Sequence, residues 1–246
     1  MLPTVSIGPA VIPTAPLSVI LGLWVSLSLV ERGARALKLN VALIYGVAST
    51  GLIAGILAAR LTFVALHWSA YQENLLGIIW PINSGFTPWG GLLIGAAAAL
   101  FYARLRQAPP AATLDALIPG IIAGLIFISL ADFLGGPGYG TTTNLPWGIS
   151  QYGVRRHPVQ LYEIVVGLTA LAVWWGSIPP RHPAGSLFLL TTSIYSAGRL
   201  FVDAFRANAW LTSSGFHVLQ IAALILTLVC LILLARGNPR QTANSS

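Results

Sequence analysis

The sequence predicts an all-α integral membrane protein in which residues 1–246 form a single membrane domain, a bundle of seven transmembrane helices. Of the 246 residues, 56% are hydrophobic and only 8% are charged, whereas a soluble domain carries about a quarter charged residues. Apolar runs of about 20 residues recur along nearly the whole chain, and a run of that length can cross a hydrocarbon core as a helix. Little sequence is therefore left for a soluble domain.

Seven apolar runs define the predicted spans, which we number in chain order. Residues 1–16 contain no Lys or Arg, so they lack the basic segment of a cleaved signal peptide and are predicted to form a short tail before a retained first helix. The first span ends at the charged run 31–35, and the third ends at Arg104 to Arg106. The fifth begins at Pro158, a residue suited to the first helical turn. The predicted spans cover about residues 14–30, 41–66, 87–105, 112–134, 158–178, 184–206 and 215–235.

The distribution of Lys and Arg predicts the orientation of the bundle. With the N-terminus outside, the outer loops 67–86 and 135–157 hold only two basic residues, Arg155 and Arg156. Because positive residues collect in short cytoplasmic loops, this arrangement favours an external N-terminus and a cytoplasmic C-terminus. The cytoplasmic segments would then hold eight basic residues, namely Arg32, Arg35, Lys38, Arg104, Arg106, Arg181, Arg236 and Arg240.

Charge, cysteine and histidine content exclude several classes of partner. The net charge of +7 would suggest nucleic acid for a soluble protein, but here the basic residues lie mostly in short loops, where they orient helices and meet anionic lipid. No nucleic-acid partner is therefore predicted. Cys230 is the only cysteine, which excludes a disulfide or a thiolate metal site within the chain. His67, His182 and His217 have no histidine or carboxylate partner at metal-ligand spacing, so neither a metal site nor another cofactor is predicted.

Ionisable side chains within the spans gather near the predicted outer ends. A charge near the centre of a transmembrane helix costs about 2.5 to 3.5 kcal/mol and usually faces the bundle interior or a water-filled cavity. Arg60 lies about 9 Å below the outer end of the second span, at about 1.5 Å per residue. Asp132 lies near the outer end of the fourth span, and Glu163 lies near the outer end of the fifth. Asp115, near the inner end of the fourth span, is predicted to be an interfacial residue. These positions predict a polar site in the outer half of the membrane.

Helical spacing arranges further polar residues on two stripes. Side chains three or four residues apart lie on the same face of a helix. The first stripe, at the start of the fifth span, is Arg156, Gln160 and Glu163, and the second, in the sixth span, is Tyr195, Arg199, Asp203 and Arg206.

Two interpretations of these stripes remain open. One is a structural ion network, with Asp203 bridging Arg199 and Arg206, and Glu163 pairing with Arg60 or Arg156. The other is a ligand site, because four arginines against three carboxylates leave an excess of positive charge and the start of the fifth helix adds backbone donors, which suit a phosphate. The expected ligand is then an anionic lipid headgroup in the outer leaflet, with His157 as a helix cap or a headgroup donor.

One block of eight residues resembles a signature of the bacterial prolipoprotein diacylglyceryl transferases. Residues 156–163, Arg-His-Pro-Val-Gln-Leu-Tyr-Glu, match that family's Arg-His-Pro-Ser-Gln-Leu-Tyr-Glu motif at every position except Val159. Three further segments are similar to family motifs in the same order: 55–60 to Gly-Gly-Arg, 89–91 to His-Gly-Gly, and 195–206 to Tyr-x-x-x-Arg-Phe-x-x-Glu-Phe-x-Arg. The resemblance covers about residues 17–235.

The resemblance implies a fold, a location and a reaction. The fold is a seven-span bundle with an external N-terminus, multi-pass in the cytoplasmic (inner) membrane of a bacterium, with its active site towards the outer leaflet. The reaction is transfer of the diacylglyceryl group of phosphatidylglycerol to the lipobox cysteine of a preprolipoprotein, with release of glycerol phosphate. The expected partners are phosphatidylglycerol, the lipobox segment of the signal peptide and membrane lipids. Such a reaction needs a clamp for the phosphate and help in deprotonating a thiol, whose ordinary pKa is about 8.5.

The residues expected to carry this reaction come from the stripes and from the matched motifs. The candidate bases are His157, Glu163 and Asp132. The substrate-binding residues are expected to be Arg60, Arg156, Gln160, Tyr162, Tyr195, Arg199, Asp203, Arg206, Gly90 and Gly91.

Several positions depart from the family's pattern, and they keep a second function open. Trp89 stands where the family has a histidine that is a proposed base, and indole cannot take a proton at neutral pH. Ser129 stands where the family has an essential arginine, and Asp132 where it has an asparagine. The alternative is a non-catalytic or altered-specificity paralogue that binds an anionic lipid or a lipoprotein in the outer leaflet. A small-solute transporter is a further alternative, which the confinement of polar residues to the outer half disfavours because a permeation path must reach the other side.

Overall fold

The computed structural model describes residues 4–8, 10–73, 75–79, 85–178 and 183–237. Over these ranges the chain is mostly helical. The long helices are α1 (Thr14–Ala36), α2 (Val41–Leu66), α5 (Pro88–Leu105), α6 (Pro110–Gly135), α7 (Val159–Gly176), α8 (Ser186–Asp203) and α9 (Val218–Gly237), and the short ones are α3 (Trp68–Tyr71) and α4 (Leu76–Ile79). The strands form two antiparallel hairpins, β1 (Thr4–Ile7) with β2 (Ala10–Pro13) and β3 (Ile149–Gln151) with β4 (Val154–Arg156). Arg181, His182 and Arg240, which enter the predictions of orientation and metal binding, lie outside the described residues.

Six helices of the described chain are long and apolar enough to cross a membrane, namely α1, α2, α5, α6, α7 and α9. The prediction of a helical, multi-pass membrane protein is therefore confirmed. Each long helix lies within a few residues of a predicted span, and α2 coincides with its span at both ends. The helix α8 occupies the position of the sixth predicted span but is not among the six apolar helices. A total of seven spans, and their orientation in the membrane, stay predictions.

The helix α1 extends beyond the predicted end of the first span. The prediction ended this span at residue 30 because charges follow, but the helix continues to Ala36. Glu31 and Arg35 lie four residues apart on the same face and form an ion pair. Such an exposed pair supports a helix, so the charged run lengthens α1 instead of ending it.

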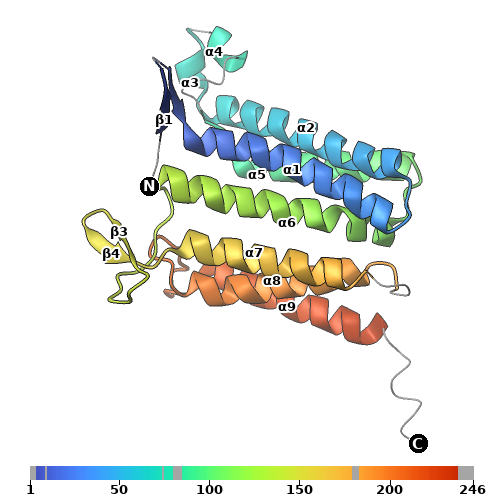
Figure 1. Ribbon diagram of the computed structural model, residues 1–246. Coiled ribbons are helices and arrows are strands. Elements are labelled where there is room, and N and C mark those ends of the chain that lie inside the picture. The colour runs from blue at the N-terminus through green and yellow to red at the C-terminus, as the bar shows by residue number, and fades with distance from the viewer. Residues whose placement is uncertain (1–3, 9, 74, 80–84, 179–182, 238–246) are drawn as a thin grey trace, which may run out of the picture.

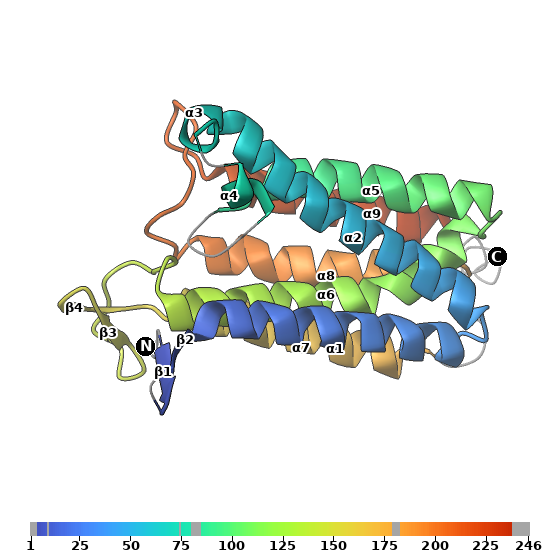
Figure 2. The same ribbon diagram turned by 90° about the horizontal axis from the view of Figure 1, so that it is seen from above.

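The long helices pack side by side in a bundle (Figures 1 and 2). The helix α1 packs against α6 and also contacts α2, and α5 packs against α2. On the other side, α6 packs against α7, α7 against α8, and α8 against α9. Both hairpins and the C-terminal ends of α2, α6 and α8 lie at one end of the bundle, whereas the C-terminal end of α9 lies at the opposite end (Figure 1). We call the first of these the hairpin end.

The hairpin β3–β4 was not predicted, although it has a recognisable turn. Gln151 pairs with Val154 across a two-residue loop. The two loop residues, Tyr152 and Gly153, have φ angles of 53° and 79°. Positive φ at both central positions is typical of the type I′ turn, which matches the twist of the flanking strands. A glycine is favoured at the second position for this reason, and Gly153 was the available signal.

A buried carboxylate joins α6 to the beginning of α8. The Asp115 side chain accepts hydrogen bonds from the backbone N–H of Gly185 at 2.6 Å and of Phe188 at 2.7 Å. Its backbone carbonyl accepts a hydrogen bond from Nε1 of Trp174 at 3.0 Å. The first turn of a helix has N–H groups without intrahelical partners, so Asp115 caps α8 from another helix. Asp115 was predicted to be an interfacial residue, and its capping role was not foreseen. In the structure the residue is buried, at 4% exposed.

Replacing Asp115 by alanine should lower the free energy of unfolding by about 1 to 3 kcal/mol, since two N–H groups of α8 would lose their acceptor. Replacement of Glu31 by alanine is the control, because an exposed ion pair contributes at most about 1 kcal/mol. Denaturant titrations of both variants in detergent, followed by circular dichroism, would measure the two losses. Equal losses would contradict the capping role.

Candidate functional site

A buried carboxylate lies at the centre of the predicted polar site. Glu163, in α7, has a side chain that is only 4% exposed. Its Oε1 accepts hydrogen bonds from Nη1 of Arg199 and from Nη2 of Arg206. Its Oε2 accepts a hydrogen bond from Oγ of Ser129, on α6, at 2.7 Å. One carboxylate therefore ties α6 and α7 to the end of α8 and holds two guanidinium groups side by side.

The ion pairs differ in part from the predicted network. Glu163 takes both of its charged partners from the sixth predicted span, so the predicted pairing with Arg60 or Arg156 is wrong. Asp203 lies near Arg206, with 3.5 Å between its Oδ1 and Nε of the arginine. Among the described residues it forms no ion pair with Arg199, so the predicted bridge between the two arginines is wrong. The predicted helical stripes are wrong at one end each, because Arg156 lies in β4 and Arg206 lies beyond the end of α8. The contact between α7 and α8 brings Glu163 close to the two guanidinium groups, which sequence spacing could not indicate.

A histidine that was not predicted as a site residue joins this network. His217 lies one residue before α9, and its Nδ1 is 3.1 Å from Oδ2 of Asp203 and 3.1 Å from the backbone oxygen of Asp203. The Asp203 side chain is 2% exposed, and that of His217 is 24% exposed. Sequence spacing did not indicate this pair, because the partner is 14 residues away and belongs to another helix. We call Ser129, Glu163, Arg199, Asp203, Arg206 and His217 the ion-paired cluster.

Two further predicted residues border the ion-paired cluster. Asp132, on α6, and Tyr195, on α8, both lie within electrostatic reach of Glu163, Arg199 and Arg206. Among the described residues, none forms a hydrogen bond or an ion pair with the Asp132 carboxylate. This half-buried carboxylate is therefore not held by a fixed partner.

Two predicted polar residues support the loop that follows α6. Arg156 donates from Nη1 to the carbonyl of Gly140 at 3.1 Å and lies over the ring of Tyr139, with its guanidinium carbon 4.8 Å from the ring centre. Gln160 is fully buried and donates to the carbonyl of Gly138. These contacts fix the loop beside the ion-paired cluster.

The same loop runs between β4 and the chain that follows α8. The N–H of Thr141 donates to the carbonyl of Phe205 at 2.8 Å, and the N–H of His157 donates to the carbonyl of Thr141 at 3.0 Å. There is no room for a side chain at Gly140, since a Cβ atom there would lie 2.4 Å from the carbonyl oxygen of His157 and 3.0 Å from that of Phe205. The sequence did not single out Gly140.

Replacing Gly140 by alanine should therefore displace this loop and lower stability, because a real Cβ does not approach backbone oxygen at such distances. Gly153→Ala is not a suitable control, since its φ is positive. Gly176→Ala is suitable, because a Cβ there would meet no atom within 4 Å. We expect Gly140→Ala to lower the melting temperature by several degrees, for a loss of about 1 to 3 kcal/mol. A melting temperature equal to that of Gly176→Ala would contradict the close approach.

His157 and Tyr162 form a separate aromatic group beside the loop. Nδ1 of His157 lies 3.2 Å from the Tyr162 hydroxyl, which also accepts a hydrogen bond from Nε1 of Trp147 at 2.9 Å. The His157 ring lies 4.8 Å from the ring of Phe205 and is buried. The N-cap of α7 is Pro158, without a side-chain hydrogen bond to the helix. The predicted capping role of His157 is therefore wrong, because its ring turns to the tyrosine instead.

Arg60 belongs to another part of the hairpin end. Its Nε and Nη1 donate to the carbonyls of Ile78 and Gly85, each at 3.0 Å, and its Nη2 donates to the carbonyl of Gly77. Its guanidinium carbon lies 5.4 Å from the ring centre of Tyr71. Arg60 thus binds backbone oxygens around α4, and in both ribbon views the end of α2 lies apart from the end of α8 (Figures 1 and 2).

The charge balance of the site changes as a result. Without Arg60, the ion-paired cluster and its neighbours contain three arginines and three carboxylates in the part of the chain that the structure describes. The predicted excess of positive charge is therefore wrong for this site. Glu163 is shared by two guanidinium groups, and one of them, Arg206, also lies near Asp203.

The two glycines after Trp89 lie at the contact between α2 and α5. A Cβ atom at Gly90 would lie 2.2 Å from Oγ1 of Thr62, and one at Gly91 would lie 2.7 Å from the carbonyl oxygen of Gly55. Small residues let helices approach closely in a membrane. Packing therefore accounts for both glycines, whereas the Trp89 side chain is exposed.

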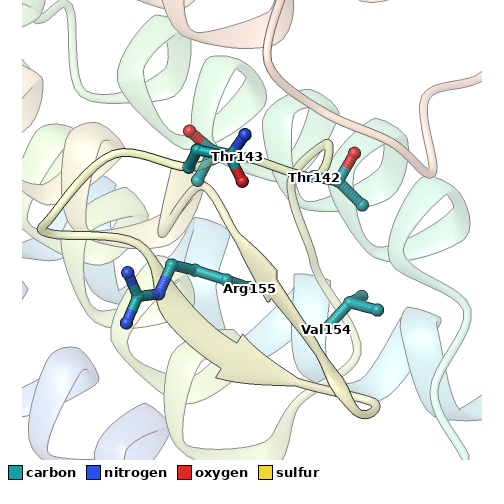
Figure 3. A pocket seen from close by; sticks show the side chains of 5 residues that line it. Thr142, Thr143, Val154 and Arg155 are labelled. Atoms are coloured by element: carbon teal, nitrogen blue, oxygen red, sulfur yellow. The ribbon is translucent and has the colours of Figure 1, made fainter.

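An open pocket lies on the β3–β4 hairpin, apart from the ion-paired cluster. Its volume is ≈ 570 Å³, and Figure 3 shows the side chains that line it. The lining residues are Thr142, Thr143, Asn144, Val154 and Arg155. None of them belongs to the ion-paired cluster, so this pocket does not contain the site.

Comparison with known proteins connects this geometry to a family. The family model for prolipoprotein diacylglyceryl transferase matches residues 4–236. The chain is similar to phosphatidylglycerol–prolipoprotein diacylglyceryl transferase from Tropheryma whipplei (strain Twist), at 30% identity over 202 residues, which cover 75% of this chain and 74% of the relative. It is also similar to the protein of the same name from Trichormus variabilis, at 28% identity over 236 residues, covering 89% of this chain and 83% of the relative. A third relative of that name, from Clostridioides difficile, is 28% identical over 171 residues, covering 70% of this chain and 68% of the relative.

Proposed function

Because the chain belongs to the prolipoprotein diacylglyceryl transferase family, we propose that it transfers the diacylglyceryl group of phosphatidylglycerol to a cysteine thiol of a preprolipoprotein. The relatives' names supply the two substrates. The observation that carries the proposal for this chain is the pair of guanidinium groups, Arg199 and Arg206, that Glu163 holds side by side. Guanidinium groups bind phosphate with forked, charge-assisted hydrogen bonds.

The two arginines have donors left for a ligand. Arg199 uses Nη1 for Glu163, and its Nε and Nη2 have no partner in the described ranges. Its side chain is 20% exposed, compared with 13% for Arg206. These free donors of Arg199 suit the oxygens of the singly negative phosphodiester of phosphatidylglycerol. Fixing both groups before the lipid arrives lowers the ordering cost of binding.

The other predicted residues support this phosphate site in different ways. Arg156 and Gln160 hold the loop 138–140, and Tyr162 with His157 packs beside it. Tyr195 and Asp132 border the cluster and are the nearest groups to contact a bound headgroup. Arg60 orders the segments around α4, and Gly90 and Gly91 let α5 approach α2.

Each candidate base has a different role in this account. Glu163 accepts hydrogen bonds on both oxygens and lies between two cations, so its role is to order the arginines. His157 orients the Tyr162 hydroxyl. Asp132 lacks a fixed partner among the described residues, so it could accept a proton without breaking a contact.

The proposed membrane placement makes α8 the sixth of seven spans, with the N-terminus outside and the C-terminus in the cytoplasm. The hairpin end then lies at the outer leaflet of a bacterial inner membrane, where the lipobox cysteine of the substrate would meet the lipid headgroup. The distribution of basic residues supports this orientation. The exposed apolar side chains of α5 and α9 suit contact with acyl chains.

The release of glycerol phosphate tests the proposed function. Purified protein in phosphatidylglycerol nanodiscs is incubated with a lipobox peptide, and water-soluble phosphate products are measured. We expect glycerol phosphate to appear only with the thiol peptide, and not with a peptide in which serine replaces the cysteine. Release that does not depend on the thiol would indicate a phospholipase. Binding of phosphatidylglycerol without release would favour a non-catalytic paralogue.

A further inference from the structure

A histidine and an aspartate form a pair at the junction of α8 and α9. Nδ1 of His217 lies 3.1 Å from Oδ2 and 3.1 Å from the backbone oxygen of Asp203. Both neighbours of Nδ1 can only accept a hydrogen bond while the carboxylate is ionised, so Nδ1 carries the proton of the neutral ring. Nε2 therefore carries the lone pair, and it has no hydrogen-bond partner within the described residues. A histidine oriented in this way by a carboxylate can take a proton from a nucleophile.

We infer that His217 is the general base that deprotonates the substrate thiol, with Asp203 as its positioning residue; this inference rests on the proposed function. Burial fixes Asp203, whose side chain is 2% exposed, while the ring of His217 keeps 24% of its surface. The base is thus accessible and its partner is not. His217 lies outside all of the matched motifs, so the resemblance to the family does not indicate this base.

The other candidate groups are less free to accept the proton. Both oxygens of Glu163 are engaged by three donors. His157 is buried against Phe205, with Nδ1 at the Tyr162 hydroxyl. Asp132 alone competes with His217, and it is included in the test below.

Asp203 connects the base to the phosphate site. Its Oδ2 faces His217, and its Oδ1 lies 3.5 Å from Nε of Arg206. The Nη2 of the same arginine donates to Glu163. The base and the two guanidinium groups therefore belong to one continuous network. No other charged group faces the ring from α8 or from the first turn of α9 in the described chain, and residues 207–216 contain none.

The proposed step balances in atoms and charge. Nε2 of His217 takes the proton of the cysteine thiol. The thiolate then attacks the carbon of the diacylglyceryl unit that bears the phosphate. A sulfur–carbon bond forms while the carbon–oxygen bond to phosphate breaks, and glycerol phosphate leaves. The imidazolium then returns its proton to the leaving phosphate, so the base is regenerated without any oxidant or further reactant.

Replacing His217 by asparagine removes the proposed base but keeps a hydrogen-bond donor for Asp203. The asparagine amide can still donate to Asp203, but nothing replaces Nε2. We expect kcat for diacylglyceryl transfer to the lipobox peptide to fall by about 100-fold or more at neutral pH, with little change in KM for phosphatidylglycerol. At alkaline pH the peptide thiol ionises by itself, since its pKa is about 8.5, so the rate of the variant should recover relative to the wild type. The control is His67→Asn, an exposed histidine whose Nδ1 lies 2.9 Å from the carbonyl of Phe63, which should leave the rate unchanged.

Three outcomes would overturn the inference about His217 and leave the proposed function standing. Normal transfer by His217→Asn would show that the ring only supports Asp203. A loss without alkaline recovery, or together with lost lipid binding, would indicate a structural defect. The alkaline recovery appearing in Asp132→Asn instead would assign the base to Asp132. A wild-type protein that makes no product would overturn the proposed function and this inference together, whereas normal transfer by His217→Asn overturns the inference alone.

Discussion

Replacing Glu163 by glutamine should reduce diacylglyceryl transfer by about 100-fold or more. Glutamine keeps the size of the side chain but removes the negative charge that Arg199 and Arg206 share. The two guanidinium groups then repel each other without a neutralising charge between them, and the amide offers one acceptor oxygen where the carboxylate offered two. A misplacement of about 1 Å at a reacting site is enough for a loss of this size.

The stability of this variant has to be measured together with its rate. Removing one partner of a buried ion network costs about 3 to 5 kcal/mol, so rates are expressed per folded protein, as counted by size-exclusion chromatography and lipid binding. Glu31→Gln makes the same chemical change at an exposed pair with Arg35 and should leave the rate unchanged. Glu163→Asp keeps the charge and should retain more activity than Glu163→Gln. A rate within about threefold of the wild type in Glu163→Gln would contradict the role of Glu163.

Replacing Arg199 by alanine should weaken the binding of phosphatidylglycerol by about tenfold or more, and that of a zwitterionic lipid much less. A hydrogen bond to a charged group contributes about 1.5 to 3 kcal/mol, and about 1.4 kcal/mol is a factor of ten. Arg199→Lys should give an intermediate loss, because an ammonium group keeps the charge but not the forked geometry. Native mass spectrometry of the protein with each lipid would measure both affinities.

The matched control for Arg199 is Arg155→Ala. Arg155 is an exposed residue of the β3–β4 hairpin and lines the open pocket in Figure 3. Removing it changes the net charge by the same amount without touching the ion-paired cluster. Equal weakening of both lipids by Arg199→Ala, or equal effects of the two alanine variants, would count against a specific phosphate site.

The parts of the fold that could be predicted are those in which local sequence decides the structure. Apolar runs determine where a helix can cross a membrane, and for this reason the ends of α2 coincide with the prediction. The end of α1 could not be predicted from the apolar run, because the ion pair between Glu31 and Arg35 continues the helix through a charged segment. The turn at Tyr152 and Gly153 was not predicted, although Gly153 is a local signal for it.

The candidate site could be predicted only as a set of residues, and not as a set of pairs. The stripes included Glu163, Arg199 and Arg206, although Arg206 lies beyond the end of α8. Their pairing depends on which helices pack together, and the spacing of 36 residues between Arg199 and Glu163 carries no signal for it. The same reason hides the pair of His217 with Asp203.

Arg60 shows the limit of arguments from depth in the membrane. Arg60 does lie near the C-terminal end of α2, but depth alone does not place two helices in contact. Its donors go to the backbone around α4, which sequence analysis treated only as a loop. An arginine in a span can therefore satisfy its donors on carbonyl groups, without any anion.

Mass spectrometry of the peptide product detects diacylglyceryl transfer to the cysteine itself. A lipobox peptide is incubated with the purified protein and with phosphatidylglycerol of defined acyl chains, and the cysteine is then located by fragmentation. We expect a mass increase equal to that diacylglyceryl group on the cysteine, in a thioether bond that withstands hydroxylamine, and no such increase with Glu163→Gln. An unmodified cysteine, under conditions in which the Clostridioides difficile relative modifies the same peptide, would contradict the account.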